Sequence, residues 1–391
     1  MSFINKILDA FKMESTREME NIADNSARHN EMPVSEPKRG IERVEKLADI
    51  AYNDRFYEDY RPVMQKTMAF TGNNFSEPAI QACAALIISG SVKRGEKIKP
   101  NDYYSYFERL YGVVNIRKLH IWLYENEYLR NATAKEVLNL YKVDELKTIL
   151  DSMGLKKNGN KQSLIDRIAE NLDDSMKEKL SSECDRYFRS EKGERFLAEN
   201  QDFVMFHKNQ YGLNFQEFCR HRILQGRKRK FYDTVFHALS ERAVTWQTKK
   251  YISQLEWVYH NLSNALYDEE KYELSLQNAL YALYFSTNLA SKYYLFSLEN
   301  VRFDGIETAK SRIDSESTFN PHIIDRILEL QSYFREQMLD VVYTPEILPY
   351  CLFGKCDMLD VVLDLYDGVF DADKYTNYIR ISYGNYAKKF L

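Results

Sequence analysis

The chain is poor in the two residues that most often interrupt regular structure. Glycine (14) and proline (8) together account for 22 of its 391 residues, about half of the ordinary usage of roughly 12 %. This scarcity argues against collagen-like repeats and against architectures rich in tight turns. At about 150 residues per domain, the length is enough for two or three domains. We therefore predict a mostly α-helical protein with several domains.

Cysteine is scarce as well, and its pattern fits neither a disulfide framework nor a zinc site. The five cysteines are widely spaced and include no Cys-x-x-Cys pair: Cys83, Cys184, Cys219, Cys351 and Cys356. An odd number of isolated cysteines is typical of reduced thiols in a cytoplasmic protein. The apolar residues at the N-terminus are too few for a signal sequence or for a membrane span of about 20 residues. We therefore expect a cytoplasmic protein without a transmembrane segment.

An excess of positive charge is also absent. Lys and Arg number 54 against 58 Asp and Glu, which gives a net charge of −4. No field from the whole molecule would then attract a nucleic acid, so any such partner must be bound by a local basic patch. Local clusters of cations are therefore the informative feature of the charge distribution.

The sequence lacks the motifs by which most enzymes are identified. It contains no phosphate-cradling P-loop, no Gly-x-Ser-x-Gly, no His-Glu-x-x-His and no paired carboxylates with the flanking lysine of a nuclease. Its seven histidines are scattered and do not assemble by spacing. We expect a protein that is not an enzyme and that needs no cofactor or metal.

The N-terminal region predicts a short helix followed by a tether. In residues 1–12 the apolar side chains recur at helical spacing: Phe3, Ile4, Ile7, Leu8 and Phe11. This amphipathic helix could dock on the protein's own body, in a groove of a partner protein or on a membrane surface. Residues 13–40 are polar and predict a flexible linker. Helical periodicity starts at residue 41, and a helix over residues 80–88 is expected to end at Gly90.

Two short helices around a glycine predict a helix-turn-helix outline within residues 41–135. Asn101 is expected to cap a helix through residues 103–110, Gly112 breaks the chain, and Asn115 is expected to cap the next helix. That second helix would carry, on or near its exposed side, Arg117, Lys118 and His120. A plain helical hairpin would give the same pattern.

Residues 203–391 predict a C-terminal helical domain that offers surfaces for protein partners. Periodicity places helices at residues 251–267, 271–289 and 323–342, with a last apolar group at 359–365. Residues 262–282 resemble one tetratricopeptide repeat, with small residues where paired helices approach. Because a stable solenoid needs at least three repeats and one is visible, an ordinary packed helix pair is the alternative.

Residues 140–168 form the most informative segment. One face of a first helix is apolar, with Val143, Leu146, Leu150 and Met153. Gly154 supplies the left-handed position after this helix, and Leu155 folds back onto the helix end. A second helix presents Leu164, Ile165 and Ile168. The loop between them contains Gly159 and three lysines, Lys156, Lys157 and Lys161, so that cations and a helix N-terminus form an edge suited to phosphates.

This segment resembles the SAP motif, a two-helix DNA-binding module of chromatin-scaffold, DNA-repair and phage-related proteins. The match covers about 30 residues within an expected module at 136–175, and includes both glycines and the loop lysine. The resemblance implies binding of duplex DNA, often A·T-rich, through Lys147, Lys156, Lys157, Gly159, Lys161 and Arg167. Three acidic residues reduce the local positive charge: Asp144, Glu145 and Asp166. Some modules of this type bind protein instead.

The flanks of the SAP-like segment resemble the two halves of a winged-helix wing. Residues 122–130 look like a recognition helix that ends in a strand. Residues 186–197 look like a returning strand, a Lys192-Gly193 turn and a closing helix, although Arg189 and Ser190 depart from the usual residues of that pattern. The SAP module would then be inserted at the wing tip, residues 176–202 would complete the wing, and Arg117 and Lys118 would also face DNA.

A second basic cluster has two interpretations: it forms a solvated helix end, or it makes further contacts to phosphates. It comprises Arg220, His221 and Arg222, followed by Arg227, Lys228, Arg229 and Lys230.

As a whole, the chain is similar to uncharacterised SAP-bearing proteins of phages and mobile elements of Gram-positive bacteria. The favoured interpretation is a non-enzymatic protein that binds double-stranded DNA. The alternative is a helical scaffold whose SAP-like module binds protein.

Overall fold

The computed structural model describes residues 67–90, 92–93, 106–226, 230–249, 251–296, 305–348 and 350–388. The predicted N-terminal helix, the linker and the helix expected from residue 41 lie outside this part of the chain, as do Asn101, Arg227, Lys228 and Arg229. The described chain is mostly helical, as the composition predicted. It forms two compact units that divide between Gln210 and Tyr211. Among the described residues, no helix is both long and apolar enough to cross a membrane.

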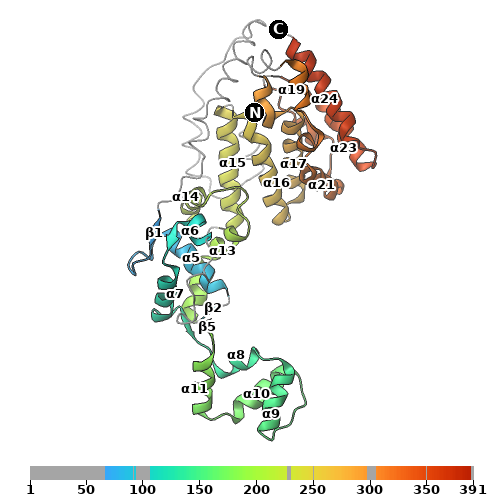
Figure 1. Cartoon of the computed structure of the whole chain (residues 1–391). Coiled ribbons are helices and arrows are strands. Elements are labelled where there is room, and N and C mark those ends of the chain that lie inside the picture. The colour runs from blue at the N-terminus through green and yellow to red at the C-terminus, as the bar shows by residue number, and fades with distance from the viewer. Residues whose placement is uncertain are drawn as a thin grey trace. The chain divides into compact units, whose positions relative to one another are not determined.

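The first unit combines helices with short strands and is coloured blue to green in Figure 1. Its elements in chain order are β1 (Met68–Ala69), α5 (Pro78–Ser89), β2 (Val92–Lys93), α6 (Tyr106–Tyr111), β3 (Val113–Val114), α7 (Ile116–Glu125), β4 (Leu129–Asn131), α8 (Ala134–Asn139), α9 (Val143–Ser152), α10 (Lys161–Asn171), α11 (Asp174–Glu183), β5 (Arg186–Arg189), α12 (Glu191–Glu199) and α13 (Gln201–Lys208).

Helix α5 is the buried centre of the first unit. Pro78 occupies its first turn, where a missing N–H group is tolerated, and Gly90 ends it as predicted. Between them, the residues from Ala82 to Ala85 are fully buried, and their small side chains let α6, α7, α12 and α13 pack closely around the helix. The thiol of Cys83 is free, and burial raises its pKa well above the usual value.

The strands form two small sheets. In the first, β1 pairs with β3 in parallel. In the second, β5 lies between β2 and β4 and is antiparallel to both. The register of β4 and β5 places Leu129 opposite Arg189 and Asn131 opposite Tyr187. The two strands predicted on either side of the SAP-like segment therefore pair with each other, and residues 132–185 lie between them.

Three local expectations for this unit are wrong. His120 is buried, with 3 % of its surface exposed, because it faces the edge of Tyr187 beneath the sheet rather than solvent. The side chain of Asn115 does not cap α7, because this residue adopts a left-handed conformation directly after strand β3. Lys192 and Gly193 are not a wing turn but belong to the first turn of α12, which the side chain of Ser190 caps.

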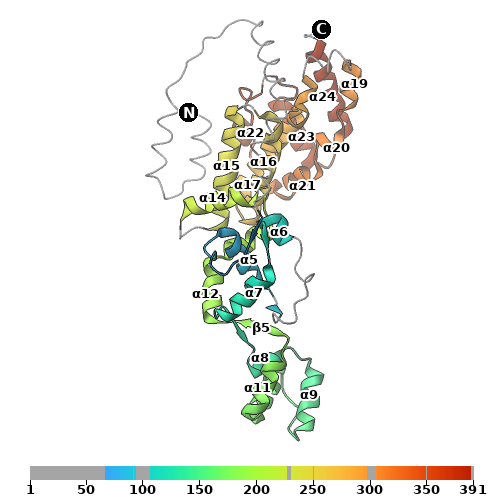
Figure 2. The ribbon, with the colours of Figure 1, turned by 60° about the vertical axis from the view of Figure 1, so that its left-hand side comes forward.

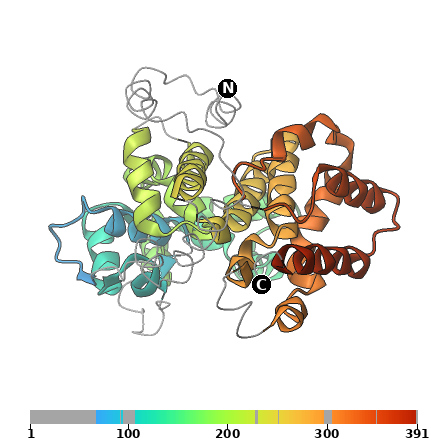
Figure 3. The same cartoon turned by 90° about the horizontal axis from the view of Figure 1, so that it is seen from above.

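The second unit, coloured yellow-green to red, contains helices and 3₁₀ turns, and no strand occurs in its described residues (Figures 2 and 3). In chain order the elements are α14 (Phe215–Gln225), α15 (Phe231–Lys249), η3 (Ile252–Gln254), α16 (Leu255–Asp268), α17 (Tyr272–Thr287), η4 (Ala290–Phe296), α19 (Ile306–Ser311), α20 (Ser315–Thr318), α21 (Pro321–Glu329), η5 (Gln331–Tyr333), α22 (Gln337–Val342), α23 (Lys355–Tyr366) and α24 (Ala372–Ala387).

Helix α17 is the central helix of this unit. All its residues from Asn278 to Thr287 are buried, and it contacts α16, α20, α21 and α22. Small side chains allow it to approach α16 closely. The hydroxyl of Ser263 donates to the backbone carbonyl of Ser275 at 2.9 Å, and the hydroxyl of Ser275 donates to the carbonyl of Ser263 at 2.8 Å. The helices predicted at 251–267 and 271–289 are confirmed to within a few residues as α16 and α17, and the apolar group at 359–365 lies within α23.

The single helix predicted over residues 323–342 is wrong. The chain forms α21, η5 and α22 instead, and Phe334 between the last two is extended, with φ −65° and ψ 136°. The break lets Leu330 stay buried and places the ring of Phe334 against Tyr366 of α23 at 5.5 Å. Packing against a neighbouring helix thus overrides a continuous helical pattern.

Candidate nucleic-acid interface

The first helix of the SAP-like segment, α9, ends as the sequence predicted. The N–H of Leu155 donates to the carbonyl of Leu150 at 2.8 Å, and the N–H of Gly154 donates to that of Asp151 at 3.0 Å. These two bonds form a Schellman motif, which needs a left-handed residue at the position of Gly154, where φ is +67°. The chain is thereby turned sharply into the loop that carries the lysines.

The second helix, α10, begins at a side-chain cap. The Oδ1 atom of Asn160 accepts hydrogen bonds from the backbone N–H and the hydroxyl of Ser163, both at 2.9 Å. Gly159 precedes this cap with φ +125°, a conformation that side chains disfavour. The positive end of the α10 dipole therefore lies at the loop, where it favours anions.

A small core holds the two helices together with α8. Its fully or nearly fully buried members are Leu138, Leu146, Leu150, Leu164, Ile165, Ile168 and Ala169. They come from all three helices, which lie close together in Figure 1, so α8 is part of the same packed body. The loop between α9 and α10 contributes Leu155 to this core and keeps its polar residues outside.

The predicted DNA-binding cations of the module fall into two groups. The side chains of Lys147 and Lys156 make no ion pair or hydrogen bond with any residue that the structure describes; Lys147 is half-buried and Lys156 is exposed. Lys157 is exposed and pairs with Asp151, with 2.8 Å between Nζ and Oδ1. These three ammonium groups are open to an external phosphate, because exposed ion pairs are weak and exchange readily with water.

Arg167 and Lys161 are bound to the module's own backbone. The guanidinium of Arg167 donates to the carbonyls of Lys156 and Asn158, the latter at 3.1 Å, and so holds the loop. Lys161 is the first residue of α10, and its ammonium donates to the carbonyl of Asn139 at the end of α8, at 2.7 Å. Both side chains therefore have a structural role that the spacing of the motif does not reveal.

Two of the three acidic residues that depart from the family pattern have partners of their own. The carboxylate of Glu145 accepts from the N–H of Lys142 at the start of α9, at 2.6 Å. Asp166 pairs with Lys135 of α8 at 2.7 Å, and this hydrogen bond lowers the pKa of Asp166. The charge of Asp166 is thus balanced by a cation outside the loop.

Both ends of the module are fixed near the paired strands β4 and β5. Arg130 of β4 donates two hydrogen bonds of 2.7 Å to Glu136 in the first turn of α8. These bonds, together with those from Thr133, lower the pKa of Glu136 to about 2. On the other side, α11 packs against α8, and Cys184 joins a small cluster with Ala132 and Val137.

A second candidate surface lies on α7. The residues of this helix that face the body are buried, namely Ile116, Leu119, His120 and Leu123. Arg117 and Lys118 are exposed on the other side, as predicted, and the ammonium of Lys118 lies 3.4 Å from the carbonyl of Thr71. Neither residue belongs to an ion pair within the described chain.

An open hollow runs along the exposed side of α7. Its lining residues are Asn115, Arg117, Lys118, Ile121, Trp122 and Glu125. Of this set, the sequence predicted only the two cations as binding residues. The spacing of three and four residues from Asn115 to Glu125 is the signal that would have identified the others.

Of the second basic cluster, Lys230 is described and exposed, while Arg222 is buried in α14.

Comparison with protein families finds a SAP domain at residues 137–173. The matched range contains α9, α10, the loop and the whole of the small core, and it suggests a DNA-binding role in general. No curated protein and no solved structure matches the chain. The resemblance of the whole chain to phage and mobile-element proteins is therefore not supported by a relative. The chain contains a SAP domain.

Proposed function

We propose that this protein binds double-stranded DNA, without enzymatic activity, by contacting phosphates through the loop of its SAP domain. The observation that carries the proposal is the loop itself. Two exposed lysines, Lys156 and Lys157, stand beside the N-terminus of α10 within the matched SAP domain. Cations and a helix dipole that act on the same edge favour a phosphate group. A phage or mobile-element origin and a cytoplasmic location belong to this proposal and rest on the sequence.

The test is a salt titration of binding to A·T-rich and mixed-sequence duplexes. Each phosphate contact that is lost should flatten the plot of log affinity against log salt by ~0.9. We expect Lys147→Ala with Lys156→Ala to flatten the slope without affecting the fold, because neither side chain has a partner in the described chain. Lys388→Ala, an exposed lysine in the other unit, is the matched control. An unchanged slope in the double variant would reject the proposed loop contact.

We further propose that α7 is a second DNA-facing element, as in a winged helix. The support is that Arg117 and Lys118 are exposed on a helix that is followed by the paired strands β4 and β5 and then by α12. A SAP domain alone offers few phosphate contacts, and non-specific binding of that kind lies near ~10⁻⁴ to 10⁻⁶ M. Two linked elements can raise affinity by ~10² or more if both reach one duplex.

This second contact predicts that the intact chain binds a duplex of about two turns at least tenfold more tightly than residues 136–175 alone. Arg117→Ala with Lys118→Ala should remove most of that gain. Equal affinity of the isolated module and the whole chain would leave α7 without a role in binding DNA. Absence of duplex binding by either would favour the alternative function, a helical scaffold whose SAP domain binds protein.

A further inference from the structure

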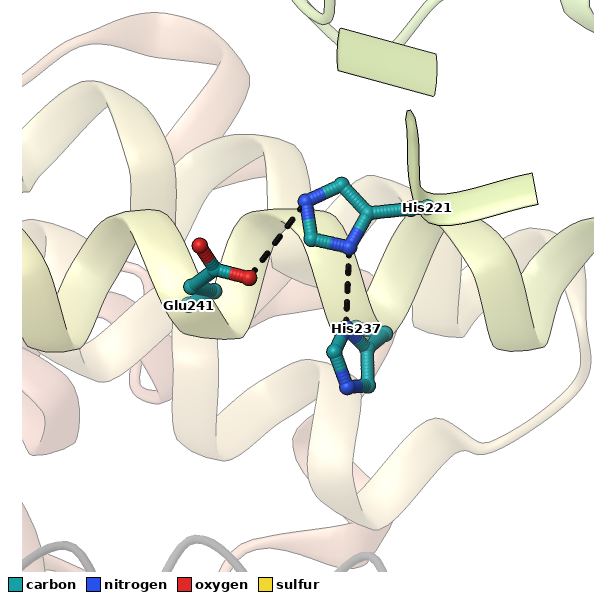
Figure 4. A group of neighbouring side chains, drawn as sticks. All are labelled: His221, His237 and Glu241. Atoms are coloured by element: carbon teal, nitrogen blue, oxygen red, sulfur yellow. Dashed lines mark hydrogen bonds and ion pairs between the residues drawn. The ribbon is translucent and has the colours of Figure 1, made fainter. Parts of the chain in front are cut away.

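Two histidines and a glutamate come together in the second unit, far along the chain from the SAP domain. His221 projects from α14, and His237 and Glu241 project from α15 (Figure 4). The two residues of α15 are four positions apart, so they lie on the same face of the helix. His221 is fully buried, with 0 % of its surface exposed, whereas the other two are half-buried.

The potential metal-ligating atoms of this cluster are close together. The Nδ1 atoms of His221 and His237 face each other at 2.9 Å. The Nε2 atom of His221 lies 3.6 Å from Oε2 of Glu241. One nitrogen or oxygen atom from each of the three side chains lies within 4.8 Å of the others. No other group of at least three His, Cys, Asp or Glu residues in the described chain has this geometry.

Arg220 holds the third member of the cluster in place. Its guanidinium contacts Oε1 of Glu241 at 3.1 Å and Nε2 of His221 at 3.0 Å. Because a guanidinium can only donate, Nε2 of His221 accepts, and its proton is placed on Nδ1, between the two rings. The pair is then joined by a single proton that two neutral imidazoles share.

Neutral imidazole is the form that binds metals. The hydrogen bond between the two rings and the guanidinium that faces Nε2 of His221 are both arrangements of neutral imidazoles.

We propose that His221, His237 and Glu241 bind one divalent transition-metal ion of the zinc class. Two imidazole nitrogens and one carboxylate oxygen are a ligand set that zinc accepts, with water at the fourth position. Calcium and magnesium prefer sites made of oxygen atoms alone, so they do not fit. The ion takes the place of the proton between the rings. That proton moves to Nε2 of His221, so Arg220 gives up its bond to this nitrogen and keeps Oε1 of Glu241, while Oε2 turns from Nε2 of His221 to the ion.

Two movements are required. Two nitrogens bound at about 2.05 Å to a tetrahedral ion are about 3.4 Å apart, compared with 2.9 Å between the Nδ1 atoms here. A rotation of the half-buried His237 ring supplies this difference. The carboxylate of Glu241 turns from the Nε2 side of His221, where Oε2 lies at 3.6 Å, to the side of the two Nδ1 atoms. Binding joins α14 to α15, the two helices on either side of the basic cluster that ends at Lys230.

The test is a titration of the full-length, chelator-treated chain with zinc, followed by calorimetry, and with cobalt, followed by its visible absorption. We expect one equivalent of metal to bind. His237→Ala and the isosteric Glu241→Gln should each weaken binding at least tenfold, a loss of ~1.4 kcal/mol for each factor of ten. His322→Ala, an exposed histidine of the same unit, is the control and should bind metal as the unchanged chain does.

Thermal unfolding gives a second readout that does not depend on DNA binding. Zinc should raise the Tm of the unchanged chain and of the His322→Ala control but not that of Glu241→Gln, because only a ligand bound to the native state stabilises it. Absence of a saturable site near one equivalent would overturn the proposal, as would binding by both ligand variants with unchanged affinity. The cluster would then be a hydrogen-bonded network only.

Discussion

The loop of the SAP domain and the exposed side of α7 both present cations, but they use them differently. In the loop, Arg167 and Lys161 donate to backbone carbonyls of the module itself. On α7, Arg117 and Lys118 extend from a helix whose opposite face is buried. The number of basic residues in a motif therefore overstates the number that can meet a phosphate. In the loop, two of the cations hold the backbone in place, whereas on α7 the only such contact within the described chain is the long one of 3.4 Å from Lys118 to the carbonyl of Thr71.

The most drastic way to break this comparison is to remove one of its two regions. Replacing residues 132–185 by a short turn should abolish the loop contacts and reduce the affinity for duplex DNA at least tenfold. The rest of the chain should remain folded, because β4 and β5 would still pair directly. Circular dichroism, cooperative thermal unfolding and duplex binding at fixed salt measure these effects. Collapse of the helical body would show that the module is not an independent insertion.

A milder change separates the structural cations from the open ones. Arg167→Ala leaves the carbonyls of Lys156 and Asn158 without their donor. Both residues are exposed, so water can replace the donor and we expect a loss of about 0.5–1.5 kcal/mol. We expect lower stability of the module, faster amide exchange in the loop and weaker DNA binding together. Arg117→Ala is the matched control and should weaken DNA binding with no change in stability. If both variants affect binding alone, the distinction drawn here fails.

The smallest expected effect distinguishes two neighbouring lysines of the loop. Lys156→Ala should flatten the salt dependence by ~0.9 if that lysine contacts a phosphate. Lys157→Ala should have a smaller effect, because the ammonium of Lys157 is shared with Asp151 at 2.8 Å. Asp151→Asn releases Lys157 and should strengthen binding slightly, while stability changes by about 0–1 kcal/mol, the range for exposed ion pairs. A larger loss at Lys157 than at Lys156 would reverse the assignment.

Local chemistry explains what could be predicted from the sequence. The end of α9 at Gly154, the apolar faces of α9 and α10 and the two strands beside the module all depend on residues close together in the chain. Short-range patterns of this kind need no knowledge of the fold. The loop lysines and the helix N-terminus predicted an edge suited to phosphates, and the family resemblance added duplex DNA as the expected partner.

The features that were missed depend on contacts between distant parts of the chain. His120 is buried because it meets Tyr187, which lies beyond the whole SAP domain in sequence. The helix expected at 323–342 breaks so that Phe334 can reach Tyr366. The His221 and His237 pair joins residues 16 positions apart on two helices, so no spacing rule could bring them together. Only the packed structure specifies these neighbours.

The antiparallel attachment of the SAP domain has a mechanical consequence. The chain leaves β4 after Asn131 and returns just before Tyr187, the residue opposite it, so a pull on the domain acts on both strands at the same end. Force then separates the three residue pairs of β4 and β5 one after another, beginning with Asn131 and Tyr187, and does not act on all three pairs at once. Each opened pair releases about 3.4 Å of chain on each strand. The attachment would therefore lengthen in steps under tension, while the helices at either end stay intact.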